Sequence, residues 1–559
     1  MMMILGIDVG GTHTDAVLIE GLKIKKKAKV LTNNKNLLDS LLTVINELLK
    51  GENTATLKRV VLSTTISTNA IVQNKTDRVS LVLISGPGIS PSLLKTDENT
   101  HFASGYVNHR GIEITKIDPE EIRWIDKKIE AENIRHIGVV GKFSTRNPDQ
   151  EIRIRDILGK RPRHISLGHR MSGHLNFPRR ISTTFLNASI WELYNNFVKQ
   201  VLDSIRHRGL SVPIYILKAD GGTIDISKSV EIPVQTILSG PAASVMGILS
   251  LFDRKEDAIA LDIGGTTTDI AMFADGVPLL EAFGITINGH KTLIRGLRTL
   301  SIGIGGDSRI KFENNMMTIG PEREGPAAAF GGPFPTPTDA MIILGLTAIG
   351  DREKAALAIK EIALKMNVSI MEAAETIIDH TCRKIASHVT GMIKEINNKP
   401  VYTIHDILEG KKLCPKSLYI VGGPAQAIAA NLGNILGCPA YISEHAEVAN
   451  AIGAALARTT AEITVLADTE RRTLTIGEEG IQITIPSEFS REDAMQVGTE
   501  KLKELAVRMG AKEEDLEIEV IENQEFNMVR EFQTTGKNIR VKLQVKPGLI
   551  AGYTRGTLV

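Results

Sequence analysis

An eight-residue segment occurs twice in this chain of 559 residues, almost letter for letter. DVGGTHTD runs from Asp8 to Asp15, and DIGGTTTD runs from Asp262 to Asp269, nearly half the chain later. Each copy follows one short apolar run and precedes another, which predicts a strand, a Gly-Gly turn and a second strand. Two matched turns in two matched halves predict two similar domains that face each other.

Turns of this kind suit an anion. Glycines allow positive φ and a close approach of backbone to phosphate, threonine hydroxyls add donors, and the leading aspartate can hold Mg²⁺ through water. One DxGGT turn alone would more often be an ordinary hairpin. The duplication favours a nucleotide whose phosphate chain lies between the two turns.

A third segment has the composition expected beside a nucleoside. In LYIVGGPAQAIAANLGNILG, at 418–437, a short apolar strand leads through Gly422, Gly423 and Pro424 into a helix. Glycines at such a junction let a purine and its ribose lie against the backbone. A plain strand-to-helix turn is the alternative, and the order of the three segments favours the nucleotide.

Composition excludes several classes of protein. Lys plus Arg number 66 against 65 Asp plus Glu, so the net charge of +1 gives no electrostatic basis for binding nucleic acid or an anionic membrane. Three widely spaced cysteines indicate a reducing compartment, with cytoplasm as the default, and argue against a disulfide framework. MMMILGI lacks a basic n-region and predicts a first strand rather than a signal peptide. The longest apolar stretch, 340–350, is too short to span a membrane and predicts a buried helix.

The length implies three or four domains. Strands alternate with helices in both halves, which predicts an α/β layout. We expect one lobe over 1–180, with the first phosphate hairpin, and a second over 181–460, with the second hairpin and the glycine-rich strand-to-helix turn. A small α+β module follows over 465–559, with a hairpin in TLTIGEEGIQITI and a helix that Ser490 and Asp493 begin in capping-box fashion. For this module we expect packing or partner contact rather than chemistry.

Several longer strings occur in a fixed order around the two repeats. They are STTISTNAIVQNK at 63–75, RRISTTFLNASI at 179–190, ADGGTIDISKSVEIPVQTILSGPAASV at 219–245 and NAIGAALA at 450–457. In this order the chain resembles the hydantoinase A and 5-oxoprolinase family, within the actin-like ATPase superfamily, from Ile4 to about Ala457. The resemblance implies two actin-like, ribonuclease H-like lobes around a nucleotide cleft.

The resemblance also implies a reaction. Members activate a cyclic amide or similar carbonyl compound with ATP, for hydrolysis or carboxylation, often together with a separate B-type subunit. Resonance makes a ring amide a poor electrophile, and phosphorylation of its oxygen supplies both activation and a leaving group. The protein would position the reactants and neutralise charge, as in other phosphoryl transfers.

Roles for individual residues follow from the same resemblance. Asp8 and Asp262 would act in catalysis by assisting Mg²⁺. The residues expected to bind the phosphates and border the adenosine of ATP are Gly10, Gly11, Thr12, Thr14, Gly264, Gly265, Thr266, Thr267, Gly305, Gly306, Gly422 and Gly423.

Departures from the family pattern fall on the substrate side. Leu62 to Thr65 lack an expected histidine, and a loop that usually contains Cys reads GPAAAFGG here. Asp307 follows the Gly-rich stretch, and Asp220 stands where Asn is common. We expect Asp220, Asp307 and Arg309 to serve substrate-side chemistry, with loop-fixing hydrogen bonds as the alternative.

Other polar residues have simpler explanations. His164, His169 and His174 recur every five residues, which suits neither a helical face nor a strand face, so we expect linker residues rather than a zinc site. His13 could contact the γ-phosphate or merely fill its position. The lysine run from Lys23 to Lys29 predicts a solvated hairpin edge.

Three functions of different class remain open at this point. The first is an ATP-dependent hydrolase or carboxylase subunit. The second is a small-molecule kinase in which Asp220 or Asp307 acts as the base. Isolation of the chain as a free homo-oligomer would favour this function. The third is an ATP-driven clamp or reactivase that reshapes a partner protein.

Overall fold

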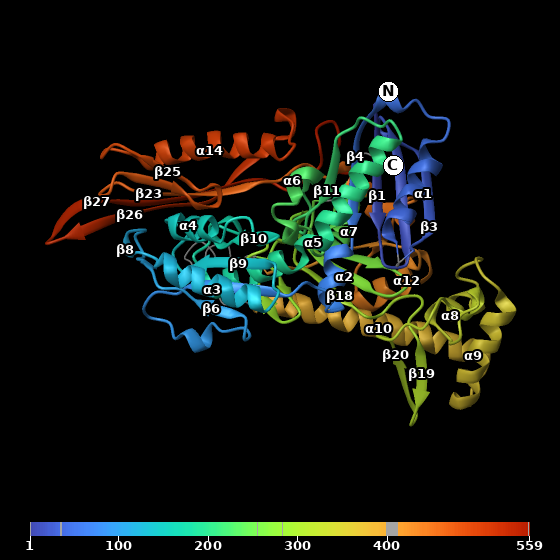
Figure 1. Ribbon diagram of the computed structural model, residues 1–559. Helices are drawn as coiled ribbons and strands as arrows, with labels where there is room; N and C mark the ends of the chain where they lie inside the picture. Colours follow the sequence, from blue (N-terminus) through green and yellow to red (C-terminus); the bar gives the residue numbers. More distant parts are fainter. Residues whose placement is uncertain are drawn as a thin grey trace.

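The computed structural model describes residues 2–33, 36–253, 255–281, 283–398, 412–556 and 558, so Met1 and Val559 at the ends of the expected ranges lie outside the described residues. Two six-stranded sheets carry the sequence repeat (Figure 1). The first has the order β12-β11-β4-β1-β2-β3, and the second has the order β15-β14-β13-β21-β22 with β18 on β14. Their strands are β1 (Met3–Val9), β2 (His13–Glu20), β3 (Lys23–Leu31), β4 (Leu57–Thr64), β11 (Ile214–Leu217), β12 (Thr223–Asp225), β13 (Ala258–Ile263), β14 (Thr268–Ala274), β15 (Val277–Pro278), β18 (Thr299–Ile302), β21 (Ser417–Val421) and β22 (Ala440–Ile442).

The two sheets are built alike around their hairpins. β1 pairs antiparallel with β2 and parallel with β4, and β13 pairs antiparallel with β14 and parallel with β21. β11 and β22 then continue each sheet in parallel. The repeat in the sequence is therefore a repeat of topology.

Helices α7 (Ser239–Leu251) and α13 (Ala449–Leu456) lie between the two sheets. One buried cluster joins Ile4 and Val17 of the first sheet to Ala258 and Ala260 of the second through residues of both helices. Both faces of each hairpin's first strand are thus covered, which explains why all seven residues of β1 are buried. Small residues bring the helices together, because a Cβ on Gly453 would lie 2.1 Å from the carbonyl oxygen of Ala243.

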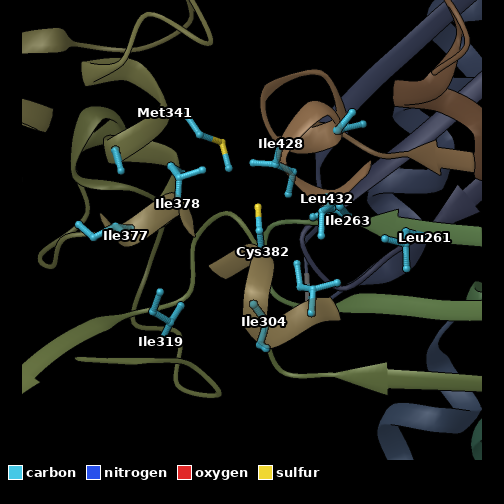
Figure 2. Packing of buried hydrophobic residues seen from close by; sticks show 14 of the residues in the cluster. Leu261, Ile263, Ile304, Ile319, Met341, Ile377, Ile378, Cys382, Ile428 and Leu432 are labelled. Carbon is cyan, nitrogen blue, oxygen red and sulfur yellow. The ribbon is translucent and has the colours of Figure 1, made fainter. Parts of the chain in front are cut away.

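The outer face of the second sheet packs on a helical layer of α8 (Pro337–Ile343), α9 (Arg352–Met366), α10 (Ile370–Asn397) and α12 (Ala425–Leu436). Figure 2 shows Cys382 of α10 among the apolar side chains of this core. The helix expected over 340–350 ends at Ile343. Gly345 has a φ of +71°, and beyond it Ile349 is 71% exposed. A left-handed glycine at a helix end stops the helix whatever the apolar content that follows.

A second sheet within the N-terminal half is parallel, with the order β10-β9-β5-β6. Its elements are β5 (Val79–Ile84), β6 (Thr100–Phe102), β9 (His136–Gly141) and β10 (His164–Leu167), with α3 (Pro119–Ala131) and α4 (Asp149–Leu158) packed on it. Shorter elements complete both halves: α2 (Ile66–Val72), α6 (Ile226–Ser229), β7 (Tyr106–Val107), β8 (Glu113–Thr115), β16 (Thr286–Ile287), β17 (His290–Lys291), β19 (Ile310–Glu313) and β20 (Met316–Ile319).

Helix α5 (Phe177–His207) joins this parallel sheet to the first six-stranded sheet. Phe177 and Ile181 at its start pack with strands β5 and β9, whereas Tyr194 and Val198 pack with β1, β4 and α1 (Leu37–Leu49). The lobe boundary expected at residue 180 falls inside this helix. The first lobe continues past it, because β11 pairs in parallel with β4.

The C-terminal module is a sheet of order β25-β24-β23-β27-β26 covered on one face by α14 (Arg491–Arg508). Its strands are β23 (Glu462–Asp468), β24 (Thr473–Ile476), β25 (Ile481–Thr484), β26 (Ile518–Arg530) and β27 (Gln533–Val545). The expected β24–β25 hairpin and the capping box of Ser490 and Asp493 are both confirmed. The long β26–β27 hairpin projects from the rest of the molecule (Figure 1).

Two further expectations concern surfaces. The lysine run forms β3, the edge strand of the first sheet, where its side chains form ion pairs with Glu20, Glu52, Asp15 and Glu447. Among the helices that the structure describes, none combines the length and apolarity needed to cross a membrane.

Candidate nucleotide site

The two DxGGTxTD segments form hairpins of identical register. The first and last aspartates of each segment are cross-strand partners, Asp8 with Asp15 and Asp262 with Asp269. Each turn closes with the same bond, from the N–H of its first glycine to the carbonyl three residues on, at 3.1 Å in the first copy and 2.9 Å in the second. The motif spacing therefore places both carboxylates on one face below a two-residue turn.

The tips of the two hairpins meet. The hydroxyl oxygens of Thr12 and Thr266 lie 3.3 Å apart, although 254 residues separate them in sequence. The lobes thus face each other through equivalent positions of the repeat. Binding of phosphate by these turns stays a prediction.

The glycines of the turns do not have the positive φ expected of them. Gly10, Gly11, Gly264 and Gly265 all lie outside the left-handed region. Close approach favours glycine at two of the four positions, since a Cβ on Gly10 would lie 2.9 Å from the carbonyl oxygen of His13 and a Cβ on Gly265 would lie 2.7 Å from Oδ2 of Asp307. Gly11 differs, because its Cβ would meet no atom within 4 Å.

One amide joins the leading aspartates of the two lobes. Nδ2 of Asn450 donates to Oδ2 of Asp8 at 3.3 Å and to Oδ2 of Asp262 at 3.0 Å. Asn450 lies in the first turn of α13, between the sheets, and the hydroxyl of Ser244 in α7 donates to the same oxygen of Asp262. Sequence reasoning assigned no role to Asn450, although it begins the NAIGAALA string.

The carboxylates are held in an unfavourable electrostatic environment. Burial raises the pKa of Asp8 to about 6, and burial together with the nearby Asp262 raises the pKa of Asp269 to about 7. Oδ1 of Asp8 and Oδ1 of Asp269 are buried without a hydrogen-bond partner among the described residues. A cavity of about 10 Å³ borders Asp262 and Asp269, room for one water-sized group. Of the two unpartnered oxygens, only that of Asp269 belongs to a residue that borders this cavity. Carboxylate oxygens without a hydrogen-bond partner are the ligand type that a hard divalent cation such as Mg²⁺ prefers.

The Gly-rich stretch after β18 lies along the second hairpin. The N–H of Gly306 donates to the carbonyl of Gly264 at 2.9 Å, and the N–H of Asp307 donates to the carbonyl of Gly265 at 2.6 Å. The carboxylate of Asp307 in turn accepts from Arg323 at 3.2 Å. These contacts place Gly305, Gly306 and Asp307 at the predicted nucleotide site.

Arg323 is a second residue that sequence reasoning missed. It belongs to the long loop between β20 and α8 of the second lobe, yet its charge reaches His13 at the start of β2 in the first lobe. Burial lowers the pKa of His13, and the charges of Lys29 and Arg323 lower it further. The only signal in the sequence was the unusual length of the loop that carries Arg323.

The glycine-rich turn before α12 lies against the second hairpin. Gly422 has a φ of +97°, and a Cβ there would lie 2.3 Å from the carbonyl oxygen of Ile263 and 2.8 Å from Oδ1 of Asp262. Any side chain at this position is therefore excluded. Gly423 has open space around it, where the adenosine is expected.

The TTISTNA and LSGPA segments lie together beside the first hairpin. Thr65 donates to the carbonyl of Val9, the last residue of β1, at 3.4 Å, and the hydroxyl of Ser239 donates to the carbonyl of Thr64 at 3.0 Å. Leu238, just before α7, has a φ of +59°. A leucine in this conformation costs about 1 kcal/mol, and such strain is typical of functional sites.

Two residues expected on the substrate side have other partners. Asp220 is buried between Lys218 at 3.5 Å and Arg295 at 3.3 Å and accepts from Thr460 at 2.8 Å. Arg309 forms an ion pair with Glu324 and lies 3.7 Å above the ring of Phe334. Both sets of contacts correspond to the loop-fixing alternative.

The three histidines expected in a linker do not converge, and the linker expectation is wrong for two of them, because His164 begins strand β10 and His169 is buried. His164 bonds Ser166, His169 bonds Glu151 and His174 lies 3.0 Å from Lys542. Elsewhere Nε2 of His136 lies between Asp77 and Glu192, at 3.8 and 3.1 Å. Its Nδ1 has no hydrogen-bond partner among the described residues, whereas a metal-ligating histidine normally donates from its second nitrogen, so we interpret this group as an ion-pair cluster.

Comparisons with known proteins agree with this geometry. The family profile of Hydantoinase/oxoprolinase matches residues 180–463, and that of the Hydantoinase/oxoprolinase N-terminal region matches residues 4–161. Acetophenone carboxylase gamma subunit from Aromatoleum aromaticum is 26% identical over 48% of this chain and 40% of its own. 5-oxoprolinase from Saccharomyces cerevisiae is 26% identical over 68% of this chain and 31% of its own length. Caprolactamase subunit alpha from Pseudomonas jessenii is 24% identical over 67% of this chain and 60% of its own length. The chain thus spans less than two thirds of the length of these relatives.

Two solved structures share the whole architecture. Nucleotide-free acetone carboxylase aligns with a TM-score of 0.72 at 18% identity, covering 99% of this chain and 89% of that one. ATP-dependent caprolactamase from Pseudomonas jessenii aligns with a TM-score of 0.71 at 19% identity, covering 99% and 88%. The predicted fold class, two actin-like α/β lobes with a C-terminal α+β module, is confirmed.

Proposed function

Because the chain belongs to the hydantoinase/oxoprolinase family, we propose that it is an ATP-dependent subunit that phosphorylates the carbonyl oxygen of a cyclic amide or related carbonyl compound. A B-type subunit would complete the hydrolysis or carboxylation. The observation that carries the proposal is the pair of hairpins whose tips meet at Thr12 and Thr266 above Asp8 and Asp262. Two facing turns would offer backbone N–H groups and threonine hydroxyls to one phosphate chain from two sides, which supports this proposal.

Each part of the site has a proposed task. The turns would bind phosphate oxygens through backbone N–H groups and threonine hydroxyls, Gly422 allows the close packing of its turn on the second hairpin, and the open space at Gly423 leaves room for the nucleoside. Asp8 and Asp262 would hold Mg²⁺, which supplies neutralisation of the phosphate charge. Asn450 fixes the two carboxylates relative to each other, and Arg323 adds positive charge beside the first hairpin.

The names of the relatives support the proposed substrate class. Their names include a caprolactamase, a 5-oxoprolinase and a carboxylase. We propose that phosphorylation of a carbonyl oxygen is the step these activities share, since it makes a poor electrophile reactive. The three cysteines are free, which agrees with work in a reducing compartment, and we propose the cytoplasm.

A small-molecule kinase is the second candidate, favoured by Asp307. This carboxylate lies against the turn at Gly265, and burial raises its pKa despite the neighbouring Arg323. A carboxylate of raised pKa beside the phosphates could accept a proton from a substrate hydroxyl. In that case the chain alone would release a stable phosphorylated product.

The test is ATP turnover by the chain reconstituted with its B-type subunit. Caprolactam, 5-oxoproline, hydantoin, and acetone with bicarbonate are supplied in turn, and phosphate release is measured. We expect turnover to rise with at least one of them, and Asp8→Ala and Asp262→Ala to reduce it by about 100-fold or more. Asp225→Ala, at the N-cap of α6, is the matched control and should keep wild-type turnover.

The other outcomes separate the remaining functions. Turnover that is the same with and without every carbonyl compound would contradict the proposal. A stable phosphorylated product made by the chain alone would establish the kinase. Tight ATP binding with very slow turnover, and release of a partner protein on nucleotide exchange, would indicate a clamp or reactivase.

A further inference from the structure

Arg323 lies beside the turn of the second hairpin. Its Nη2 donates to Oδ2 of Asp307 at 3.2 Å, and the same carboxylate oxygen would lie 2.7 Å from a Cβ on Gly265. Thr266, the next residue of this turn, contacts Thr12 at the tip of the first hairpin. The guanidinium is therefore one carboxylate away from the turn that meets the other lobe.

The charge of Arg323 also acts on the first lobe. Burial lowers the pKa of His13, and the charges of Lys29 and Arg323 lower it further. His13 directly follows the first turn in the sequence. Arg323 thus lies close enough to both hairpins for its charge to act on each.

Ion pairs on either side fix the chain at Arg323. Glu322 pairs with Lys311, and Glu324 pairs with Arg309. The N–H of Arg309 also donates to the carbonyl of Glu322 at 2.9 Å. Because both neighbours of Arg323 are already held, less conformational entropy is lost when its guanidinium binds a ligand.

The guanidinium has donors left for such a ligand. An arginine carries five N–H donors in a planar fork. Nη2 of Arg323 bonds Asp307, whereas its buried Nε has no hydrogen-bond partner among the described residues. An unpartnered buried donor costs about 1–3 kcal/mol. An oxyanion would remove this cost through charge-assisted hydrogen bonds.

The charges around the hairpins favour a phosphate as that oxyanion. Asp15 pairs with Lys29 at 2.8 Å, whereas Asp8 and Asp262 share only the neutral amide of Asn450. A triphosphate bound by the turns would add more negative charge, which one Mg²⁺ ion offsets only in part. A guanidinium can bind two phosphate oxygens at once and supplies the further positive charge.

We propose that Arg323 is a catalytic residue of the phosphoryl transfer, whose guanidinium binds oxygens of the terminal phosphoryl group of ATP while keeping its contact with Asp307. The inference rests on the proposed function, which supplies the transfer. In that step the carbonyl oxygen of the substrate forms a bond to the terminal phosphorus. The bond from this phosphorus to the bridging oxygen breaks, and its electron pair leaves with ADP. The phosphorylated carbonyl compound takes the positive charge, and the guanidinium stabilises the negative charge on the three oxygens of the moving group.

The test compares two nucleotides that differ by the terminal phosphate. The full-length wild-type chain, Arg323→Ala and Arg323→Lys are each titrated with MgADP and with Mg-AMPPNP, a non-hydrolysable analogue of ATP, by calorimetry. The Tm of each chain is measured as well. Arg383→Ala on α10 is the matched control, because Arg383 likewise pairs with a single aspartate, Asp379 at 2.7 Å, in the same lobe.

We expect Arg323→Ala to weaken binding of Mg-AMPPNP by about tenfold or more and to change binding of MgADP by less than about twofold, with a Tm near that of the wild type. Arg323→Lys should lose less affinity for Mg-AMPPNP, because it keeps a point charge without the planar fork. Arg383→Ala should bind both nucleotides like the wild type.

Two results for Arg323→Ala would overturn the proposal. Equal weakening for MgADP and Mg-AMPPNP would show a structural role. Wild-type affinity for Mg-AMPPNP, with a higher KM for the carbonyl compound in the reconstituted pair, would show that the guanidinium binds an anionic group of the substrate instead. Failure of the proposed function is distinguishable, because turnover by the wild-type pair would then respond to none of the carbonyl compounds, whatever the affinities of the Arg323 variants.

Discussion

Thr12 and Thr266 occupy the same position in the two copies of the repeat, and their hydroxyl oxygens lie 3.3 Å apart across the lobes. Because equivalent tips meet, the N–H groups and threonine hydroxyls of each turn face those of the other turn. A phosphate group bound by both turns would lie beside this contact or would separate the two hydroxyl groups.

Cysteines at these two positions test the contact directly. In a Cys414→Ser background, which removes the exposed native cysteine, Thr12→Cys/Thr266→Cys should form an intramolecular disulfide under mild oxidation, because the native oxygens are already close. Peptide mapping by mass spectrometry measures the crosslink. MgATP should slow it several-fold by occupying the contact, and an equal rate with MgATP would place the phosphates elsewhere.

Alanine substitutions at Gly265 and at Gly11, one glycine from each turn, should have unequal effects on the Tm. Gly265→Ala forces a Cβ against Asp307, so we expect a Tm several degrees lower and weaker ATP binding. Gly11→Ala meets no atom within 4 Å and should keep the wild-type Tm, while the added methyl group weakens ATP binding from the open side. Thermal unfolding and ATP titration of both variants provide the comparison, and equal losses of Tm would contradict it.

Asn450 should act on the metal rather than on the nucleoside. Asn450→Asp keeps the shape of the side chain but replaces a donor by a third carboxylate beside Asp8 and Asp262. We expect kcat/KM for ATP to fall by about tenfold or more and the Mg²⁺ concentration for half-maximal turnover to change. Asn434→Asp on α12 is the control. Unchanged Mg²⁺ dependence in Asn450→Asp would show that the amide has only a structural role.

Substitution of Asp220 and substitution of Asp307 should have different effects on stability and turnover. Asp220→Asn leaves Lys218 and Arg295 buried with a weaker partner, so we expect a loss of about 3 kcal/mol in unfolding free energy and near-normal turnover in the folded fraction. Asp307→Asn should lower turnover with a smaller loss of stability. Denaturation and turnover assays of both variants measure this. A stable Asp220→Asn variant without activity would instead indicate that Asp220 takes part in substrate-side chemistry.

Glu478 should make the stability of the chain depend on pH. Burial raises its pKa to about 7 from 4.5, so the folded state binds a proton that the unfolded state has released. Stability is then lost as pH rises from about 4.5 to about 7, and Glu478→Gln should remove this loss. We expect the variant to be more stable than wild type by about 3 kcal/mol at pH 8 and by less than about 1 kcal/mol at pH 5. Glu479→Gln, whose native carboxylate pairs with Arg508, is the control and should show no gain at pH 8.

Features set by local rules could be predicted from the sequence. The two hairpins, the capping box at Ser490 and the edge strand of lysines each depend on residues a few positions apart, where turn chemistry, capping and alternation act. The repeat also predicted that the two lobes face each other, because two equal halves need a common interface.

Features that depend on distant contacts could not be predicted. Asn450 reaches Asp8 over 442 residues only because α13 packs between the sheets. Arg323 reaches the first lobe through the path of a long loop. The lobe boundary was hidden because α5 shows no helix-breaking residue at position 180, so its pattern gave no sign that it spans two sheets.

Helix α5 has a mechanical consequence. Its 31 residues form a rod about 45 Å long. One end is embedded beside the strand that leads to Asp8, and the other is embedded in the parallel sheet. A rigid rod of this length carries a rotation at one end to the other, so a tilt of a few degrees of α5 about its end beside β1 would move the far end by several ångströms. Any such tilt would displace the four-stranded sheet relative to the first hairpin.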